Sequence, residues 1–129
     1  MVTSVKDMIA DAVAQIGLVT VQEAANELDV GDVVLVDVRE PTEWEHHVAG
    51  ALQVPRGLLE FAADPASPRH LAELDPSRRI IVMCRSGARS ALAGSTLKDM
   101  GFDDVRNLSS GFAARTEASL PTAEHTAQI

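Results

Sequence analysis

The residues best suited to chemistry stand in one short stretch, 84–90, which holds the only cysteine of the 129-residue chain. A free thiol has a pKa of about 8.5, and adjacent cations or the amino end of a helix lower it. Arg85 and Arg89 supply cations, and Gly87 permits a turn in which successive amide hydrogens face one centre. The stretch predicts a Cys84 thiolate held in an anion-binding loop. A buried structural cysteine is the alternative, but two arginines within the next five residues argue against burial in an apolar core.

The elements around this stretch are expected to place the cysteine at one edge of a sheet. The apolar run 80–83 predicts a buried parallel strand. After the loop, Ala93, Leu97 and Met100 recur at helical spacing, and Gly101 ends the pattern. Open α/β sheets bind ligands at the carboxyl ends of their strands, which is where Cys84 would lie.

Further strands are predicted at 33–39, 52–54 and 102–108. Asp37 and Arg39 close the first of these, at the same edge of the sheet as Cys84. A capping box, Thr20 with Glu23, predicts a helix from residue 21.

An amphipathic helix is expected at 4–16, with its apolar residues on one face. Docking on its own domain is the simpler interpretation of that face, and a dimer or partner surface is the other. The proline-rich segment 56–74 is expected to be a loop with short helical turns, which leaves open whether Arg56 adds positive charge to a pocket.

The loop Cys-Arg-Ser-Gly-x-Arg-Ser resembles the active-site loop of the rhodanese superfamily, specifically of single-domain rhodaneses. The resemblance extends to the Asp-Val-Arg-Glu-Pro run at 37–41, and to a segment in which His47 would close a short helix before Gly50 and Ala51. It covers roughly residues 19–121. It implies an α/β fold of three layers, with about five parallel strands and helices on both faces.

The resemblance also implies an activity. The family's loop cysteine takes sulfur from a donor such as thiosulfate, holds it as a persulfide, and passes it to cyanide or a thiol. Cys84 would be the catalytic residue, and Asp37 and Arg39 would support the loop rather than react. The expected substrate-binding residues are those that follow the cysteine: Arg85, Ser86, Gly87, Ala88, Arg89 and Ser90.

Three departures from the family pattern fall near the end of the chain. Ser110 and Ser119 stand where glycines are usual, and Arg115 stands where a tryptophan is usual. They concern the packing of the final helix or a wall near the pocket, and not the chemistry of the loop.

Three other functions use residues of the same types. A phosphatase or arsenate reductase would use the same thiolate, but the related phosphatases carry one more residue in the loop than the six from Cys84 to Arg89. A cysteine hydrolase would take His47 as its base, although no spacing demands it. A sulfur-relay or binding module for a protein partner is the third.

Composition restricts the partners. A net charge of −8 argues against nucleic acid and anionic membranes, and no apolar run reaches the length of a membrane span. A single cysteine cannot form an internal disulfide and fits a reducing compartment, so a cytoplasmic location is expected. The expected partners are a small anionic sulfur donor and a cyanide, small-thiol or protein-thiol acceptor, with the chain a monomer or homodimer.

Neither a metal nor a cofactor is expected. The segment 43–47 combines carboxylates with two histidines, but adjacent histidines point in different directions, and no further His or Cys stands at ligand spacing.

The sequence predicts three parts of the chain: a helical extension at 1–18, the domain at 19–121 and a flexible tail at 122–129.

Overall fold

Five strands form one parallel sheet in the computed structural model, which describes residues 2–117 and 123–124. Their order across the sheet is β1-β6-β5-β2-β4. The bounds are Leu18–Val19 for β1, Val33–Asp37 for β2, Leu52–Gln53 for β4, Arg79–Met83 for β5 and Asp104–Leu108 for β6. The predicted α/β fold with about five parallel strands is confirmed.

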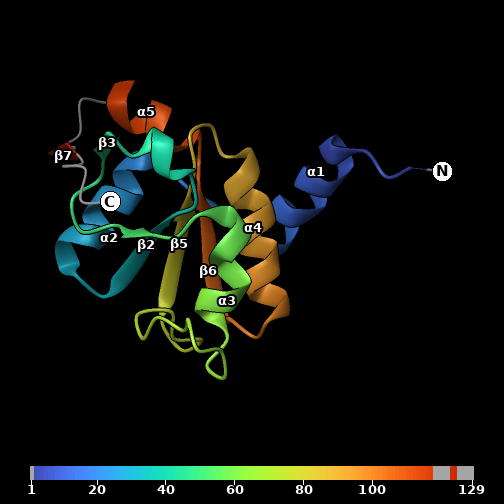
Figure 1. Ribbon diagram of the computed structural model, residues 1–129. Coiled ribbons are helices and arrows are strands. Elements are labelled where there is room, and N and C mark those ends of the chain that lie inside the picture. The colour runs from blue at the N-terminus through green and yellow to red at the C-terminus, as the bar shows by residue number, and fades with distance from the viewer. Residues whose placement is uncertain (1, 118–122, 125–129) are drawn as a thin grey trace.

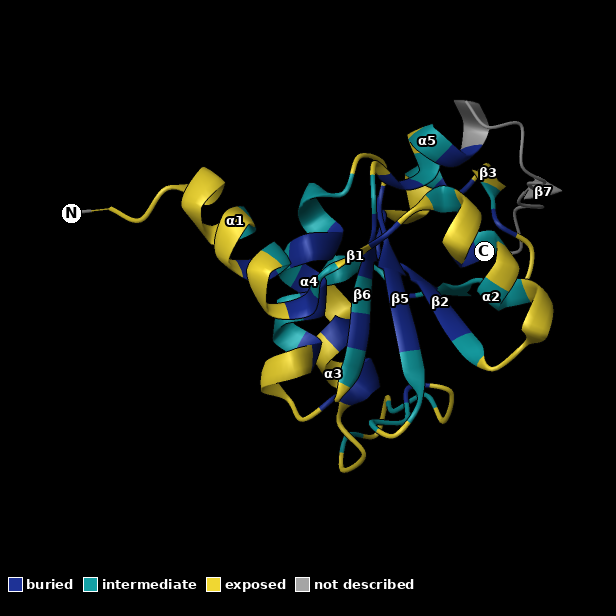
Figure 2. Cartoon of the chain, turned by 180° about the vertical axis from the view of Figure 1, so that it is seen from behind, coloured by how far each residue is buried: buried dark blue, intermediate teal, exposed yellow. Residues whose placement is uncertain are grey.

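The central strand β5 lies between β2 and β6 and is covered on both faces (Figure 2). Ile80 through Met83 have no exposed surface, which explains why this stretch is continuously apolar instead of alternating. The parallel register of β2 and β5 sets Asp37 beside Met83, one residue before Cys84. The carboxyl ends of both strands therefore meet at the same edge.

Helices cover the two faces of the sheet as separate layers (Figure 1). One layer holds α1 (Val5–Ile16), α3 (Leu59–Ala63) and α4 (Ala88–Asp99), and the other holds α2 (Val21–Val30) and α5 (Gly111–Glu117). The apolar residues of β5 alternate between these layers. Ile80 and Val82 pack with the first, and Ile81 and Met83 with the second.

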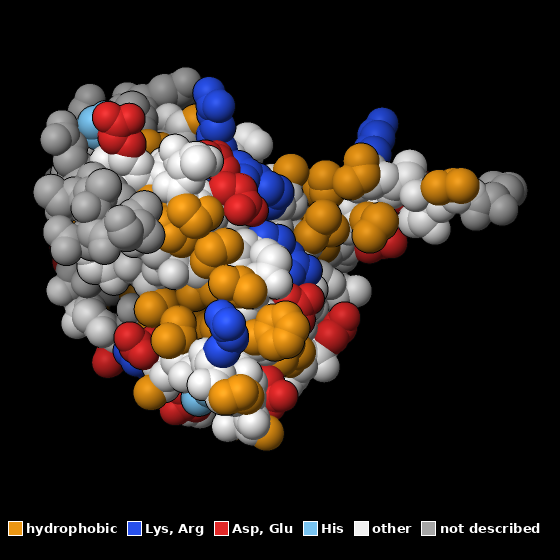
Figure 3. Space-filling model, viewed as in Figure 1, with side chains coloured by type: hydrophobic (Ala, Val, Ile, Leu, Met, Phe, Trp, Pro, Cys, Tyr) orange, Lys and Arg blue, Asp and Glu red, His pale blue; other side chains and the backbone are white. Residues whose placement is uncertain are grey.

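Helix α1 docks through its second half and projects from the domain with its first half (Figures 1 and 2). Ala12 and Ile16 are buried against α4, and the lack of a side chain at Gly94 lets Ile16 approach that helix closely. Val5 and Met8, on the first turns, stay exposed. Figure 3 shows apolar side chains gathered on the projecting part of the molecule. The extension at 1–18 is thus anchored to the domain core by one end.

A few of the helices and strands in the structure differ from those predicted from the sequence. The expected short helix ending at His47 is instead a 3-10 turn, η1 (Pro41–Glu43), followed by β3 (His46–His47). Segment 56–74 opens with another 3-10 turn, η2 (Arg56–Leu58), ahead of α3. Strand β3 pairs antiparallel with β7 (Ala123–Glu124), inside the predicted tail. The rest of that tail, and Ser119, lie outside the described residues.

Across the described residues, no helix is both long enough and apolar enough to cross a membrane.

Candidate active site

Cys84 follows the last residue of β5, and its sulfur accepts three hydrogen bonds from the loop. The amide of Gly87 lies 3.1 Å from Sγ, the amide of Ser90 3.4 Å, and the hydroxyl of Ser90 3.3 Å. The residue is only 1% exposed and belongs to the buried core cluster, so the expectation against burial is wrong, although loop donors reach its sulfur. The predicted cradle of backbone amides around the sulfur is thus present in the structure.

Local sequence explains why the loop curls around the sulfur. Gly87 has φ of 108°, a conformation that side chains disfavour, and it is the N-cap of α4. Ser90 lies in the first turn of α4, where backbone amides have no partner within the helix. The amino end of α4 therefore presents its free donors to Cys84, and it favours negative charge there.

The ionisation of Cys84 is governed by these hydrogen bonds. Burial raises the pKa of the thiol, but the hydrogen bonds from Ser90, Gly87 and Ser86 more than offset that effect, so the pKa lies below its usual value. The sequence analysis had credited Arg85 and Arg89 with this role. In the structure the loop donors supply the main stabilisation of the thiolate.

Arg89 is held by a carboxylate that the sequence analysis did not assign to the site. Its two terminal nitrogens lie 2.6 and 2.9 Å from the carboxylate oxygens of Glu43. This hydrogen-bonded pair lowers the pKa of Glu43 to about 2. The pair joins the end of the cysteine loop to η1, 46 positions earlier in the chain, and nothing local in the sequence indicates it.

The remaining loop residues face outward. Arg85 and Ser86 are exposed, while Ala88 is half-buried at the start of α4. Arg85 borders an open cavity of about 680 Å³ at the sheet edge, together with Arg39, Glu43, Glu45, His46 and Phe112. Positively and negatively charged side chains therefore both line the cavity beside the cysteine loop.

Asp37 and Arg39 form a buried ion pair beneath this cavity. Asp37 is fully buried and Arg39 is 3% exposed, with 2.8 Å between the guanidinium and a carboxylate oxygen. Arg39 also donates to the carbonyls of Glu43 and His46, at 3.0 and 2.9 Å, and stacks 4.1 Å from the ring of Phe112. The pair ties the segment after β2 to α5, and because both side chains are buried it is not a surface ion pair.

The start of α5 supports the back of the cysteine loop. Phe112 donates its amide hydrogen to the carbonyl of Cys84 at 2.8 Å, and Ala113 donates to that of Arg85 at 3.0 Å. Ser110 has a left-handed φ of 58°, and Gly111 follows with 56°. Although Ser110 stands where a glycine is usual in the family, the chain still makes this turn.

Arg115 does not reach the cysteine loop. It is 7% exposed and lines a cavity under α2 with Leu28, Asp29 and Val48. Burial lowers its pKa, which the nearby Asp29 partly offsets. The arginine at this position thus lies in the packing between α5 and α2.

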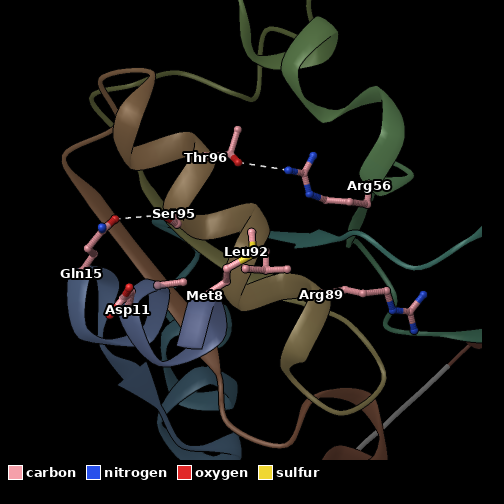
Figure 4. A pocket seen from close by; sticks show the side chains of 9 residues that line it. Met8, Asp11, Gln15, Arg56, Arg89, Leu92, Ser95 and Thr96 are labelled. Atoms are coloured by element: carbon pink, nitrogen blue, oxygen red, sulfur yellow. Dashed lines mark hydrogen bonds between the residues drawn. The ribbon is translucent and has the colours of Figure 1, made fainter. Parts of the chain in front are cut away.

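A separate groove of about 380 Å³ lies between α1, α4 and η2 (Figure 4). Arg56 donates to the hydroxyl of Thr96 at 3.1 Å on one side, and Ser95 donates to Gln15 at 2.9 Å on the other. Arg89 borders this groove, while its guanidinium reaches away to Glu43. Arg56, considered as a source of positive charge for the active site, thus lies on the η2 side of this groove, across it from α1, and does not line the cavity beside Arg85.

His47 and the acidic residues near it make no metal site. One nitrogen of the His47 ring lies 3.2 Å from the carbonyl oxygen of Trp44. In the described part of the chain, no group of three or more His, Cys, Asp or Glu side chains is arranged to hold a metal ion.

Comparison with known families agrees with this geometry. Residues 20–118 match the model of the Rhodanese-like domain. The chain belongs to this family. Helix α1 and strand β1 precede the matched region and β7 follows it, whereas the other strands, Cys84 and the Asp37–Arg39 pair lie within it.

Curated relatives of this rhodanese-like chain carry sulfurtransferase names. An Allochromatium vinosum sulfurtransferase is 36% identical over 94 residues, which cover 72% of this chain and 80% of that protein. A probable adenylyltransferase/sulfurtransferase of Mycobacterium tuberculosis is 34% identical over 119 residues, 88% of this chain. The chain spans only 29% of the length of that second relative.

Solved structures show the same fold. A Rhodopseudomonas palustris protein of unknown function, described as a possible tyrosine phosphatase, superposes with a TM-score of 0.88 at 32% identity, covering 95% of this chain and 96% of that one. The polysulfide-sulfur transferase homodimer of Wolinella succinogenes gives 0.73 at 26% identity, covering 95% and 89%. Both alignments extend beyond the family domain.

Proposed function

We propose that this protein is a sulfurtransferase that moves sulfane sulfur from an anionic donor such as thiosulfate to a thiophilic acceptor, through a persulfide on Cys84. The observation that carries the proposal is the sulfur of Cys84 accepting two backbone amides and one hydroxyl. Such a site stabilises a sulfur anion, and it sits in a rhodanese-like domain that has relatives named as sulfurtransferases.

The first half-reaction forms the persulfide. The Cys84 thiolate attacks the outer sulfur of thiosulfate, a new S–S bond forms, and the S–S bond of thiosulfate breaks. Sulfite leaves with the electron pair of that bond. The amides of Gly87 and Ser90, which already bind the thiolate, would stabilise the negative charge that remains on the persulfide.

The second half-reaction returns the enzyme to its starting state. The acceptor, cyanide or a thiolate, attacks the outer sulfur of the persulfide and forms a bond to it. The S–S bond to Cys84 breaks, and its electron pair restores the thiolate. With cyanide the product is thiocyanate. The chain has no second cysteine to resolve the persulfide, so the sulfur must leave to another molecule.

Phosphate-ester hydrolysis is the second candidate, because one structural neighbour is described as a possible tyrosine phosphatase. Two observations favour sulfur transfer instead. The loop from Cys84 to Arg89 has six residues, one fewer than the related phosphatase loops in the resemblance above. Arg89 is also engaged by Glu43, so its guanidinium is already occupied.

A protein thiol or a sulfur-relay partner is an alternative acceptor. Among the relatives, a Bacillus subtilis protein named as a putative sulfur carrier is 36% identical over 78 residues, 60% of this chain and 38% of that protein. Persulfide-dependent binding to a protein, with slow turnover on cyanide, would favour this version of the proposal.

A cytoplasmic location and a monomeric or homodimeric state remain predictions.

A paired assay separates the two chemistries. Purified protein is given thiosulfate and cyanide, with thiocyanate as the readout, and in parallel an aryl phosphate. We expect thiocyanate formation that Cys84→Ser abolishes without loss of folded structure, and no phosphate release. Hydrolysis of the aryl phosphate without thiocyanate formation would overturn the proposal in favour of a phosphatase.

A further inference from the structure

Asn107 lies behind the cysteine loop, near the end of β6, and is 2% exposed. Its side-chain Nδ2 donates to the carbonyl of Gly87 at 3.0 Å, and its Oδ1 lies 2.6 Å from the hydroxyl of Ser90. A carbonyl oxygen can only accept, so the NH₂ group must face Gly87 and the amide oxygen must face Ser90. The surroundings therefore fix which way the amide points.

The hydroxyl of Ser90 stands between two acceptors. Its oxygen lies 2.6 Å from Oδ1 of Asn107 and 3.3 Å from the sulfur of Cys84. A hydroxyl has a single proton, so it donates fully to only one of them at a time. While Cys84 is a thiol, its S–H can donate to Ser90, and Ser90 to Asn107. Once Cys84 is ionised, the sulfur and Asn107 compete for the same proton.

We propose that Asn107 is a positioning residue that shares the Ser90 hydroxyl proton with Cys84 and so limits how tightly the loop holds the sulfur anion. The distance to Asn107 is at the short end for an O–H···O hydrogen bond, and the distance to Cys84 is ordinary for an acceptor as large as sulfur, so both acceptors are placed to take the proton. The role in transfer rests on the proposed function, whereas the competition for the proton is a property of the thiol itself.

This competition for the Ser90 proton affects the reactivity of the Cys84 thiolate. The nucleophilicity of a thiolate falls as its pKa falls, and the best attacking thiol has a pKa near the ambient pH. The buried loop already gives Cys84 two amide donors in addition to Ser90. By taking part of the third hydrogen bond, Asn107 keeps the sulfur anion reactive instead of over-stabilised.

The charged groups around the cysteine loop are the same in variants of Asn107 and Ser90 as in the wild type. The loop itself carries Arg85 and Arg89, the latter paired with Glu43, and β2 contributes the buried Asp37–Arg39 pair. On β6, next to Asn107, Arg106 donates to the carbonyl of Ile16 at 3.0 Å. Among the described residues, none of these groups hydrogen-bonds to the Asn107 side chain. Its replacement by an apolar residue therefore removes only its bonds to the Ser90 hydroxyl and to the Gly87 carbonyl, and that carbonyl still accepts from the amide of Ala91 at 3.1 Å.

A double-mutant cycle tests the inference. The pKa of Cys84 is measured from the pH dependence of alkylation by iodoacetamide in wild type, Asn107→Leu, Ser90→Ala and the double variant. Ser90→Ala removes a donor and should raise the pKa. Asn107→Leu releases the hydroxyl to the sulfur and should lower the pKa by about 0.5 to 1 unit. In the Ser90→Ala background, Asn107→Leu should leave the pKa unchanged.

Opposite signs of the Cys84 pKa shift in the two single variants would distinguish a positioning role of Asn107 from a purely structural one. Loosening of the loop alone would raise the pKa of Cys84 in both single variants. A raised pKa in Asn107→Leu, or an equal shift in both backgrounds, overturns the inference. Asn107→Val, which suits a β strand, replaces the leucine variant if that one fails to fold. Alkylation needs no sulfur donor. The cycle can therefore succeed even if thiosulfate transfers no sulfur, in which case only the proposed function fails.

Discussion

Gly111 lies directly against the carbonyl oxygen of Cys84. A Cβ added to Gly111 would overlap that oxygen and lie 2.8 Å from the carbonyl carbon of Arg85, and neither backbone atom can rotate away. The amide of the next residue, Phe112, donates to the same Cys84 carbonyl. The position of the nucleophile thus depends on the close approach of a glycine from another element.

Gly111→Ala is expected to move the loop and weaken the site. The left-handed φ of 56° would cost about 1–2 kcal/mol for a residue with a side chain, before the overlap with the loop is counted. Displacing the loop should slow sulfur transfer by roughly 10- to 100-fold. Urea unfolding and the thiocyanate assay would measure the two effects.

Gly101→Ala is the matched control. Gly101 also has positive φ, 106°, but a Cβ there would meet nothing within 4 Å. It should show a similar backbone cost without the loss of activity. Equal activity losses in both variants would show that contact with the loop is unimportant.

Asp37→Asn is expected to destabilise the fold by about 3–5 kcal/mol, because it leaves the buried guanidinium of Arg39 without its counter-charge. Chemical denaturation would measure the change in the free energy of unfolding. Asp104→Asn, at a more exposed pair with Arg79, should cost less than about 1 kcal/mol. Similar costs for the two would contradict the buried, supporting role given to Asp37.

Glu43→Gln tests the link between η1 and the cysteine loop. Because the pKa of Glu43 falls from 4.5 to about 2 in the folded protein, the ion pair contributes its full stability above about pH 4.5. That contribution is lost as the pH falls toward 2. Since the pair is partly exposed, we expect about 0.5–1 kcal/mol at neutral pH.

The readout for Glu43 is the difference in unfolding free energy between wild type and variant across that pH range. Glu60→Gln, at the exposed pair with Arg56, serves as the comparison. A difference for Glu43→Gln that grows on acidification would contradict the assigned ion pair.

Ile16→Ala tests whether α1 belongs to the folded unit. Ile16 is 1% exposed and packs against α4, so truncation should cost about 2–5 kcal/mol. Val5→Ala, on the exposed part of the same helix, should change the stability by less than about 0.5 kcal/mol. A wild-type-like unfolding midpoint for Ile16→Ala would mean that α1 is dispensable to the domain.

Local patterns predicted the parts of this protein that depend on nearby residues. The apolar run of β5, the loop after it and the capping box of Thr20 each appear where the sequence placed them. Strands β1, β3 and β7, of two residues each, were not predicted, because so short a strand has no readable periodicity and forms only by pairing with a distant partner. The equally short β4 lies in the run 52–54, which was predicted as a strand.

Two residues of the site were not predicted for the same reason, namely that their partners are distant in the sequence. Glu43 and Asn107 reach the loop across 46 and 17 positions of chain, and an acid in a turn or an amide on a strand carries no signal of its own. The sequence pointed to the arginines as the groups that stabilise the thiolate, and Arg89 does interact electrostatically with Cys84, but the hydrogen bonds from Ser90 and Gly87 could not be foreseen. Charge is visible in a sequence, whereas the partner that occupies Arg89 is visible only in the fold.

The most direct test of persulfide chemistry is the intact mass of the purified protein before and after thiosulfate, and again after cyanide. The account predicts that wild type gains the mass of one sulfur atom and loses it to cyanide as thiocyanate, while Cys84→Ser gains nothing. No gain in the wild type, with Cys84 also inert to an alkylating agent, would contradict the central claim that this cysteine acts as the nucleophile.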